Sequence, residues 1–269
     1  MNPVLEVINN RRSVRKYSER PISSAEKDQI LQAALRSPTA GNMMLYSIIE
    51  IEDQELKNRL SVTCDNQPFI AKAPWVLLFL ADYERWWDYY QHCEIKKYCE
   101  EKGLAYRLPQ EGDMLLAACD ALIAAQTAVL AAESLGIGSC YIGDILENYE
   151  IHRDLLSLPE YAIPITLLCF GYPFEGEKPV RKTSRFELEF IVFKDRYKRL
   201  EHDDLSRMFQ AQENLCAKEG WSLEGARNVG QNNFQKKFIA DFSIEMNRSV
   251  KAMFNNLKKM NKPNRWMVP

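Results

Sequence analysis

The chain has 269 residues, enough to bury a full core in one domain with additions or in two small domains. Its 35 Lys and Arg residues nearly balance 37 Asp and Glu residues, so the charge excludes a protein drawn as a whole to nucleic acid or a membrane surface. Seven cysteines without a CxxC pair do not suggest a disulfide framework at this length, so we expect a reducing compartment. Residues 1–7 lack the apolar core of a secretory signal, and the cytoplasm is the expected location.

Two helices and a strand are predicted at the start of the chain. Apolar residues within 4–8 share one helical face, and this pattern ends at Asn10. The run Ser23-Ser24-Ala25-Glu26 has the capping-box form that opens a second helix. Turn formers fill residues 37–42 before the apolar segment 45–51, which indicates a helix-loop-strand unit.

The centre of the chain predicts a covered sheet. Continuous apolar runs at 75–80 and 165–170 have the length of strands buried on both faces. Residues 114–135 form an alanine-rich apolar helix, but Asp120 and Glu133 within it would be costly in hydrocarbon, so we predict a core helix and not a membrane span. Together these elements indicate an α+β sandwich.

Two segments look added to this core. Residues 83–112 combine aromatic and charged side chains, which predicts a helical, lid-like insertion. From residue 190 onward the chain is charged and helical, and apolar residues spaced by threes and fours form a stripe that needs a partner surface. The stripe comprises Phe234, Phe238, Phe242, Met246, Val250, Met253, Leu257 and Met260.

The segment Arg11-Arg12-Ser13-Val14-Arg15 places three guanidinium groups and a hydroxyl just beyond the first helix. Such groups can bind a phosphate through charge-assisted hydrogen bonds, although a solvated basic turn gives the same pattern. A second basic group, Lys178-Pro179-Val180-Arg181-Lys182, follows the last apolar strand and could close the same site.

Between these basic groups lies the glycine-bearing segment 136–144. Its glycines permit close backbone approach to a flat ligand, while Gly136 also suits a helix terminator. Tyr141 occupies the place of a third glycine and the segment follows a helix, so it is not the dinucleotide-binding fingerprint.

The ordered set of segments resembles the nitroreductase family of FMN flavoproteins. The segments are 10–15, 37–42, 73–76, 136–143, 171–173 and 179–182, which together span about the first 185 residues. The resemblance implies an FMN-binding α/β sandwich over residues 1–189, with a central, mostly antiparallel sheet flanked by helices. It leaves residues 190–269 as a helical C-terminal extension. One departure is that Met44-Leu45-Tyr46 replaces the Gln-Pro-Trp often seen after the loop asparagine.

The resemblance also implies the site residues. Those matching the FMN-binding positions are Arg11, Arg12, Ser13, Arg15, Asn42, Asn66, Gln67, Tyr141, Ile142, Gly143, Asp144, Arg181 and Lys182. Among them, Arg15 is the candidate cation near the flavin pyrimidine ring, and the segment from Tyr141 to Asp144 matches the loop that packs beside the isoalloxazine ring. Trp86, Trp87, Tyr89 and Tyr90 could stack on substrate, or could pack the insertion on the core.

The chemistry implied is that of the cofactor, and no protein acid, base or nucleophile is required. NADPH or NADH would reduce FMN, which would then reduce a small acceptor such as a nitroaromatic or a quinone in ping-pong fashion. The family works as a homodimer with FMN between the subunits, and we expect the C-terminal extension to pack on the partner. Another FMN enzyme of the same fold (a reductive dehalogenase, an enone reductase or a flavin-fragmenting enzyme) and a non-enzymatic flavin-binding protein stay open.

Other candidate sites carry less weight. His92, Cys93 and Cys99 lack a second close pair of metal ligands, and no metal is expected. Cys140 is expected to be a buried, inert thiol more than a redox group. His152 and His202 have no evident partners, so surface or capping roles are predicted for both.

Overall fold

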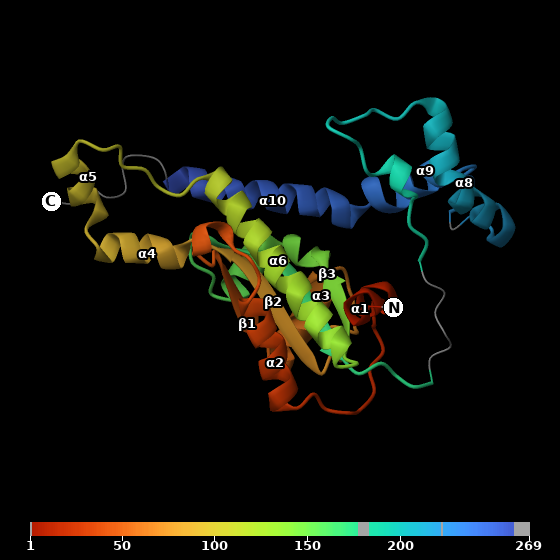
Figure 1. The fold of residues 1–269 in the computed structure, drawn as a ribbon, viewed down its shortest axis with the longest axis horizontal. Helices are drawn as coiled ribbons and strands as arrows, with labels where there is room; N and C mark the ends of the chain where they lie inside the picture. Colours follow the sequence, from red (N-terminus) through yellow and green to blue (C-terminus); the bar gives the residue numbers. More distant parts are fainter. Residues whose placement is uncertain (1, 177–182, 222, 261–269) are drawn as a thin grey trace. The chain divides into compact units, whose positions relative to one another are not determined.

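The computed structural model describes residues 2–176, 183–221 and 223–260 (Figure 1). The chain divides into two compact units, one formed by residues 1–177 with 245–269 and the other by residues 178–244. Residues from Glu245 on therefore belong to the first unit, whereas the predicted extension runs as one piece from residue 190.

The first unit contains a four-stranded sheet in which every pairing is antiparallel. Its strands are β1 (Tyr46–Glu50), β2 (Trp75–Asp82), β3 (Gly138–Ile142) and β4 (Ala162–Gly171), in the order β1-β2-β4-β3. Every residue of β2 is buried, as its continuous apolar run predicts. The predicted α+β class is confirmed, and β3 is left at one edge of the sheet.

The helices of this unit begin and end where local signals place them. Asn2 accepts a hydrogen bond from the Val4 amide at the first helix, and the predicted capping box between Ser23 and Glu26 is present at the second. The helical segments are α1 (Pro3–Asn10), α2 (Ser24–Leu35), η1 (Ala40–Asn42), α3 (Gln54–Thr63), α4 (Glu84–His92), α5 (Ile95–Lys102), α6 (Glu111–Ser134), η2 (Gly143–Leu146), α7 (Tyr149–Leu155) and, from Glu245 on, α10 (Asp241–Met260).

Alternate side chains of β2 fill two separate cores because successive residues of a strand point to opposite faces. Trp75, Leu77 and Phe79 cluster with residues of α2 and α6, whereas Val76 and Leu78 cluster with residues of α3 and η2. Figure 1 shows α6 running across the sheet. The sheet is therefore covered on both faces.

Helix α6 is long and apolar enough to cross a membrane by length and composition, and 44% of its most apolar window is buried inside the protein. Its small residues, among them Ala121, Ala124 and Ala128, are fully buried against the sheet. Asp120, which argued against a membrane span, is also buried, and it accepts hydrogen bonds from the backbone amides of Ala40 and Leu45. A central core helix, as predicted, accounts for these contacts.

Part of the C-terminal apolar stripe finds its surface within the first unit. Met253 and Leu257 of α10 are each only 1% exposed and cluster with Leu45, Met114 and Tyr149. The stripe therefore needs no second chain at these positions.

The second unit has little core of its own. It contains η3 (Leu188–Phe190), α8 (His202–Glu219), α9 (Val229–Asn233) and η4 (Phe234–Phe238), the last a π-helical turn. Within its described residues, the buried apolar side chains are those of Phe190 and Ala226. Tyr197 and Phe238 are 83% and 72% exposed. The described residues of this unit therefore leave large apolar side chains uncovered.

Candidate functional site

The basic segment lies along the free edge of the sheet as a short extra strand. Ser13 forms a parallel bridge with Ser139 of β3, and the Val14 amide donates to the Ser139 carbonyl over 2.9 Å. A Cβ atom on Gly138 would lie 2.4 Å from Cγ2 of Val14, well inside contact distance. Gly138 thus permits close approach of the basic segment, and not of a flat ligand as the sequence suggested.

The guanidinium groups of this segment gather beside β3. Burial raises the pKa of the Cys140 thiol, whereas the charge of Arg15 and a hydrogen bond with Ser13 lower it. Burial raises the pKa of Tyr141 to about 12 against the opposing charge of Arg11. Within the described part of the chain, Arg11 and Arg15 form no ion pair. Their positive charge is available to an anionic ligand.

Glu133 at the end of α6 lies near the same arginines. Burial raises the pKa of its carboxyl to about 7, while Arg11 and Arg12 lower it. Its Oε1 atom is buried without a hydrogen-bond partner among the described residues. Because the pKa of this carboxyl is about 7, it carries less than a full negative charge beside Arg11 near neutral pH.

A second segment, around residues 66–69, joins the basic segment to the end of β3. The Arg15 guanidinium lies 5.7 Å from the centre of the Phe69 ring. Two residues earlier, Gln67 donates from Nε2 to the Asp144 carboxylate over 2.7 Å and to the Cys64 carbonyl over 3.0 Å. Asn66 is in the left-handed conformation, with φ of 50°. The structure therefore brings together three of the predicted segments, 11–15, 66–67 and 141–144.

The segment 141–144 is only partly a loop. Tyr141 and Ile142 end strand β3, and Gly143 and Asp144 open the single turn η2. The Tyr141 hydroxyl donates to Gln126 of α6 over 3.1 Å. No neighbouring atom lies within 4 Å of the Cβ position of Gly143, so the space beside its backbone is open.

Asn42 lies on a separate loop that Asp120 anchors. Besides the amides of Ala40 and Leu45, the Asp120 carboxylate accepts a hydrogen bond from the Thr39 hydroxyl. No described contact joins Asn42 to the arginine group. In the segment Met44-Leu45-Tyr46, the side chains of Leu45 and Tyr46 are 0% and 3% exposed, so both pack in the core.

The aromatic insertion is helical, as predicted, and is tied to that same loop. Trp86 donates from its indole nitrogen to the Met43 carbonyl over 2.7 Å and packs against the buried cluster that contains Leu45, Met114 and Tyr149. Trp87 and Tyr90 line a shallow cavity of about 210 Å³ within the insertion. Its lining is completed by Tyr83, Ile95, Cys99, Ala105, Tyr106, Arg107 and Pro109. Trp87 packs against the same cluster, with its ring centre 5.9 Å from that of Tyr161. Both tryptophans therefore pack the insertion on the core, and a substrate-stacking role of Trp86, Trp87 and Tyr90 stays a prediction.

Several further predictions have clear outcomes. Cys140 is buried, at 1% exposed, with a pKa raised by burial, as expected of an inert thiol. His202 is on the surface, but the prediction for His152 is wrong, because its side chain is fully buried. The spacing of Tyr149, His152 and Leu156 on one helical face was the signal that could have revealed this burial. Arg181 and Lys182 lie outside the described residues.

The chain matches known proteins in both sequence and structure. A protein-family model described as "Nitroreductase family" matches residues 8–172. The chain is 33% identical over 211 residues to an FMN reductase [NAD(P)H] of Bacillus subtilis, covering 78% of this chain and 80% of that protein. It is 32% identical over 209 residues to an oxygen-insensitive NADPH nitroreductase of Salmonella typhimurium, covering 77% and 80%. The solved structure of an NADPH:FMN oxidoreductase from Vibrio harveyi complexed with NAD+ superposes with a TM-score of 0.74 at 26% identity, covering 94% of this chain and 98% of that one.

Proposed function

Because the chain belongs to the nitroreductase family and is an NAD(P)H-dependent FMN oxidoreductase, we propose that it reduces a small, flat acceptor such as a nitroaromatic or a quinone. The observation that supports this most directly is the union of segments 11–15, 66–67 and 141–144 at the free edge of the sheet. Donor and acceptor would occupy the same flavin face in turn, which gives ping-pong kinetics.

The side chains at this edge fit an anionic flavin nucleotide. Arg11 and Arg15 supply charge without competing ion pairs among the described residues, and Ser13 adds a hydroxyl. We assign the FMN phosphate to this basic group, with Arg15 available to stabilise negative charge on the flavin pyrimidine. When bound, FMN supplies the hydride chemistry. The open backbone at Gly143 leaves room for the ring system to approach.

The spectrum of the purified protein tests the proposal. Oxidised FMN gives visible absorbance bands, and rapid mixing with NADPH or NADH should bleach them before any acceptor is added. Mixing the reduced protein with a quinone or a nitroaromatic compound should then restore the bands. A flavin that neither nicotinamide bleaches would identify a binding protein, and bleaching without reoxidation by either acceptor would indicate a different FMN enzyme of this fold.

We further propose a homodimer whose interface includes α1 and the outer face of α6, which contact each other. Val4 and Leu5 of α1 are 62% and 53% exposed, and Leu115 and Leu122 of α6 are 64% and 46% exposed. Exposed apolar side chains of this kind favour contact with a second copy. Sedimentation of Leu115→Glu against the unaltered protein tests the interface, and a monomeric unaltered protein would exclude it.

The second unit gives a reason to propose that the C-terminal extension also packs on the partner subunit. Its Leu188, Tyr197 and Phe238 stay 76%, 83% and 72% exposed. Tyr197→Ser with Phe238→Ser should weaken dimerisation while leaving α10 in place. An unchanged dimer dissociation constant would exclude this role.

We also propose a cytoplasmic location. All seven cysteines are free thiols, which is typical of proteins in a reducing compartment.

A further inference from the structure

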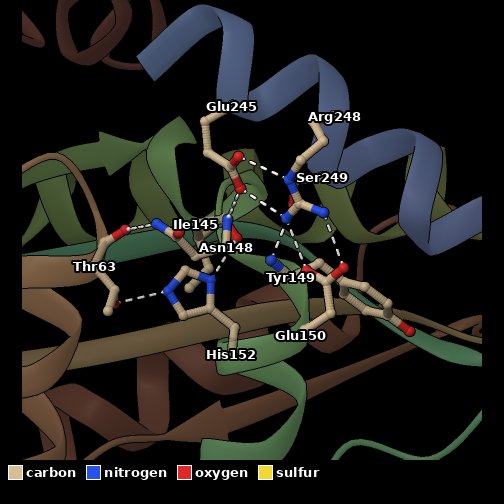
Figure 2. A network of polar contacts seen from close by, with 9 residues as sticks. All are labelled: Thr63, Ile145, Asn148, Tyr149, Glu150, His152, Glu245, Arg248 and Ser249. Atoms are coloured by element: carbon tan, nitrogen blue, oxygen red, sulfur yellow. Dashed lines mark hydrogen bonds and ion pairs between the residues drawn. The ribbon is translucent and has the colours of Figure 1, made fainter. Parts of the chain in front are cut away.

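A buried histidine joins two of the segments that form the proposed flavin site. His152 of α7 has no exposed surface, and both of its ring nitrogens have protein partners. Nδ1 lies 3.0 Å from the Ile145 carbonyl of η2, and Nε2 lies 2.8 Å from the Thr63 hydroxyl at the end of α3. Figure 2 shows the ring between these two elements. We call these three residues the His152 bridge.

Each end of the His152 bridge is next to a proposed flavin segment. Thr63 is followed directly by the turn that contains Asn66 and Gln67, and Ile145 directly follows Asp144. The hydrogen bond from Gln67 to Asp144 joins the same two segments on the side of the site. The spacing between the two segments is thus fixed twice, once by this partly buried hydrogen bond and once by the buried imidazole.

The imidazole acts here as a neutral group. Burial lowers the pKa of His152, so the uncharged ring is the stable form near neutral pH. Because a carbonyl only accepts, Nδ1 carries the hydrogen and donates to Ile145. Nε2 then presents its lone pair to the Thr63 hydroxyl, whose single hydrogen it shares with the Arg59 carbonyl 3.1 Å away. A side chain that lacks either the donor or the acceptor leaves the Ile145 carbonyl or the Thr63 hydroxyl without this contact.

Helix α10 holds the histidine-bearing helix in place. Asn148 directly precedes α7 with φ of 50°, and its side chain donates to the Thr63 carbonyl over 2.8 Å, so it does not cap the helix. The missing cap comes from α10, where Glu245 accepts from the Asn148 amide and Ser249 from the Tyr149 amide (Figure 2). Arg248 also forms a two-pronged ion pair with Glu150, at 2.9 and 2.8 Å.

We infer that His152 is a positioning residue for the flavin site, and that it sets the spacing of the segments 66–67 and 143–144 through its hydrogen bonds to Thr63 and Ile145. This inference rests on the proposed placement of FMN at those segments. His152 touches neither cofactor nor substrate in this assignment. It acts on FMN affinity and potential through the backbone that it holds.

The experiment compares Thr63→Val with Thr63→Ser, because valine keeps the side-chain size and removes the hydroxyl, whereas serine keeps the hydroxyl. FMN affinity and the flavin midpoint potential are measured for each, together with amide hydrogen exchange of 63–67 and 143–146 in the FMN-free protein. Ile30→Ala, which empties a fully buried position in the other core, controls for general loss of stability. His152→Ala is measured with and without added imidazole.

We expect Thr63→Val to weaken FMN binding about tenfold, equivalent to about 1.4 kcal/mol. Exchange should accelerate in both segments together, and Thr63→Ser should resemble the unaltered protein. Imidazole should restore FMN binding to His152→Ala. The inference is overturned if Thr63→Val and Thr63→Ser behave alike, or if Ile30→Ala shifts the potential as much as Thr63→Val does.

The proposed function can fail separately. If the unaltered protein binds no FMN, the placement of the cofactor is wrong, while the exchange data still report whether the bridge couples the two segments. If FMN binds to the unaltered protein and exchange changes in only one segment of Thr63→Val, the positioning role is wrong and the proposed function stands.

Discussion

Replacing both Arg11 and Arg15 with alanine should release FMN without unfolding the protein. Each arginine is assigned a charge-assisted hydrogen bond to the phosphate or pyrimidine, and each such bond contributes about 1.5 to 3 kcal/mol. If the two contributions add, about 3 to 6 kcal/mol is lost, which raises the FMN dissociation constant about 10²- to 10⁴-fold. The double variant should therefore be purified without its yellow cofactor.

The FMN-free fold should change little, because neither arginine forms an ion pair within the described ranges. The principal loss is the contact of Arg15 with the Phe69 ring, at 5.7 Å, which is worth about 0.5 to 1 kcal/mol. Thermal unfolding of the FMN-free double variant should therefore occur close to that of the FMN-free parent. Titration with FMN, followed by flavin fluorescence, measures the affinity.

Arg20→Ala is the matched control. Arg20 lies in the same N-terminal region, but its guanidinium lies 3.7 Å from the centre of the Tyr172 ring and 3.8 Å from the Glu26 carboxylate. Its loss should leave FMN affinity unchanged. Full flavin content in the Arg11 and Arg15 double variant would show that the phosphate binds elsewhere, and a large loss of stability before FMN is added would show that the arginines serve the fold.

Three further perturbations test the surrounding structure. Gly138→Ala should displace Val14 and the basic segment from β3 and lower the FMN content, whereas Gly112→Ala, with no atom within 4 Å of its added methyl, should unfold at or slightly above the parent temperature. Asp120→Ala leaves the amides of Ala40 and Leu45 without their acceptor and should lower the free energy of unfolding, measured in urea, by about 3 kcal/mol or more. A decrease below about 1 kcal/mol would mean that these amides find other acceptors. Burial raises the pKa of Glu147 to about 7, so the folded protein favours the protonated carboxyl. The free energy of unfolding should therefore decrease as the pH rises from about 4.5 through 7. Glu147→Gln should therefore unfold at a higher temperature than the parent at pH 8 and with a smaller advantage at pH 5; equal differences at the two pH values would contradict this assignment.

Local signals were sufficient for the elements themselves. The capping box at Ser23 and the glycine terminator at Gly136 act within one turn of chain, so they fixed helix ends before any tertiary contact was known. The continuous apolar run of β2 predicted its burial on both faces for a similar reason, since side-chain chemistry alone decides it. The order of the basic and glycine-bearing segments was also enough to identify the family.

Only the tertiary structure decided which distant groups meet. The Val14 amide bonds to the Ser139 carbonyl, and Gln67 bonds to Asp144, through single hydrogen bonds whose partners no local pattern specifies. His152 likewise changed from an assumed surface residue to a buried bridge, because its burial depends on α3 and η2 closing around it. The amino-acid sequence thus determined the helices and strands, the family and the types of functional group present. The fold determined how far apart those functional groups lie. The physical reason is that helix ends and strand faces depend on neighbouring residues, while a binding site depends on the register between segments far apart in the chain.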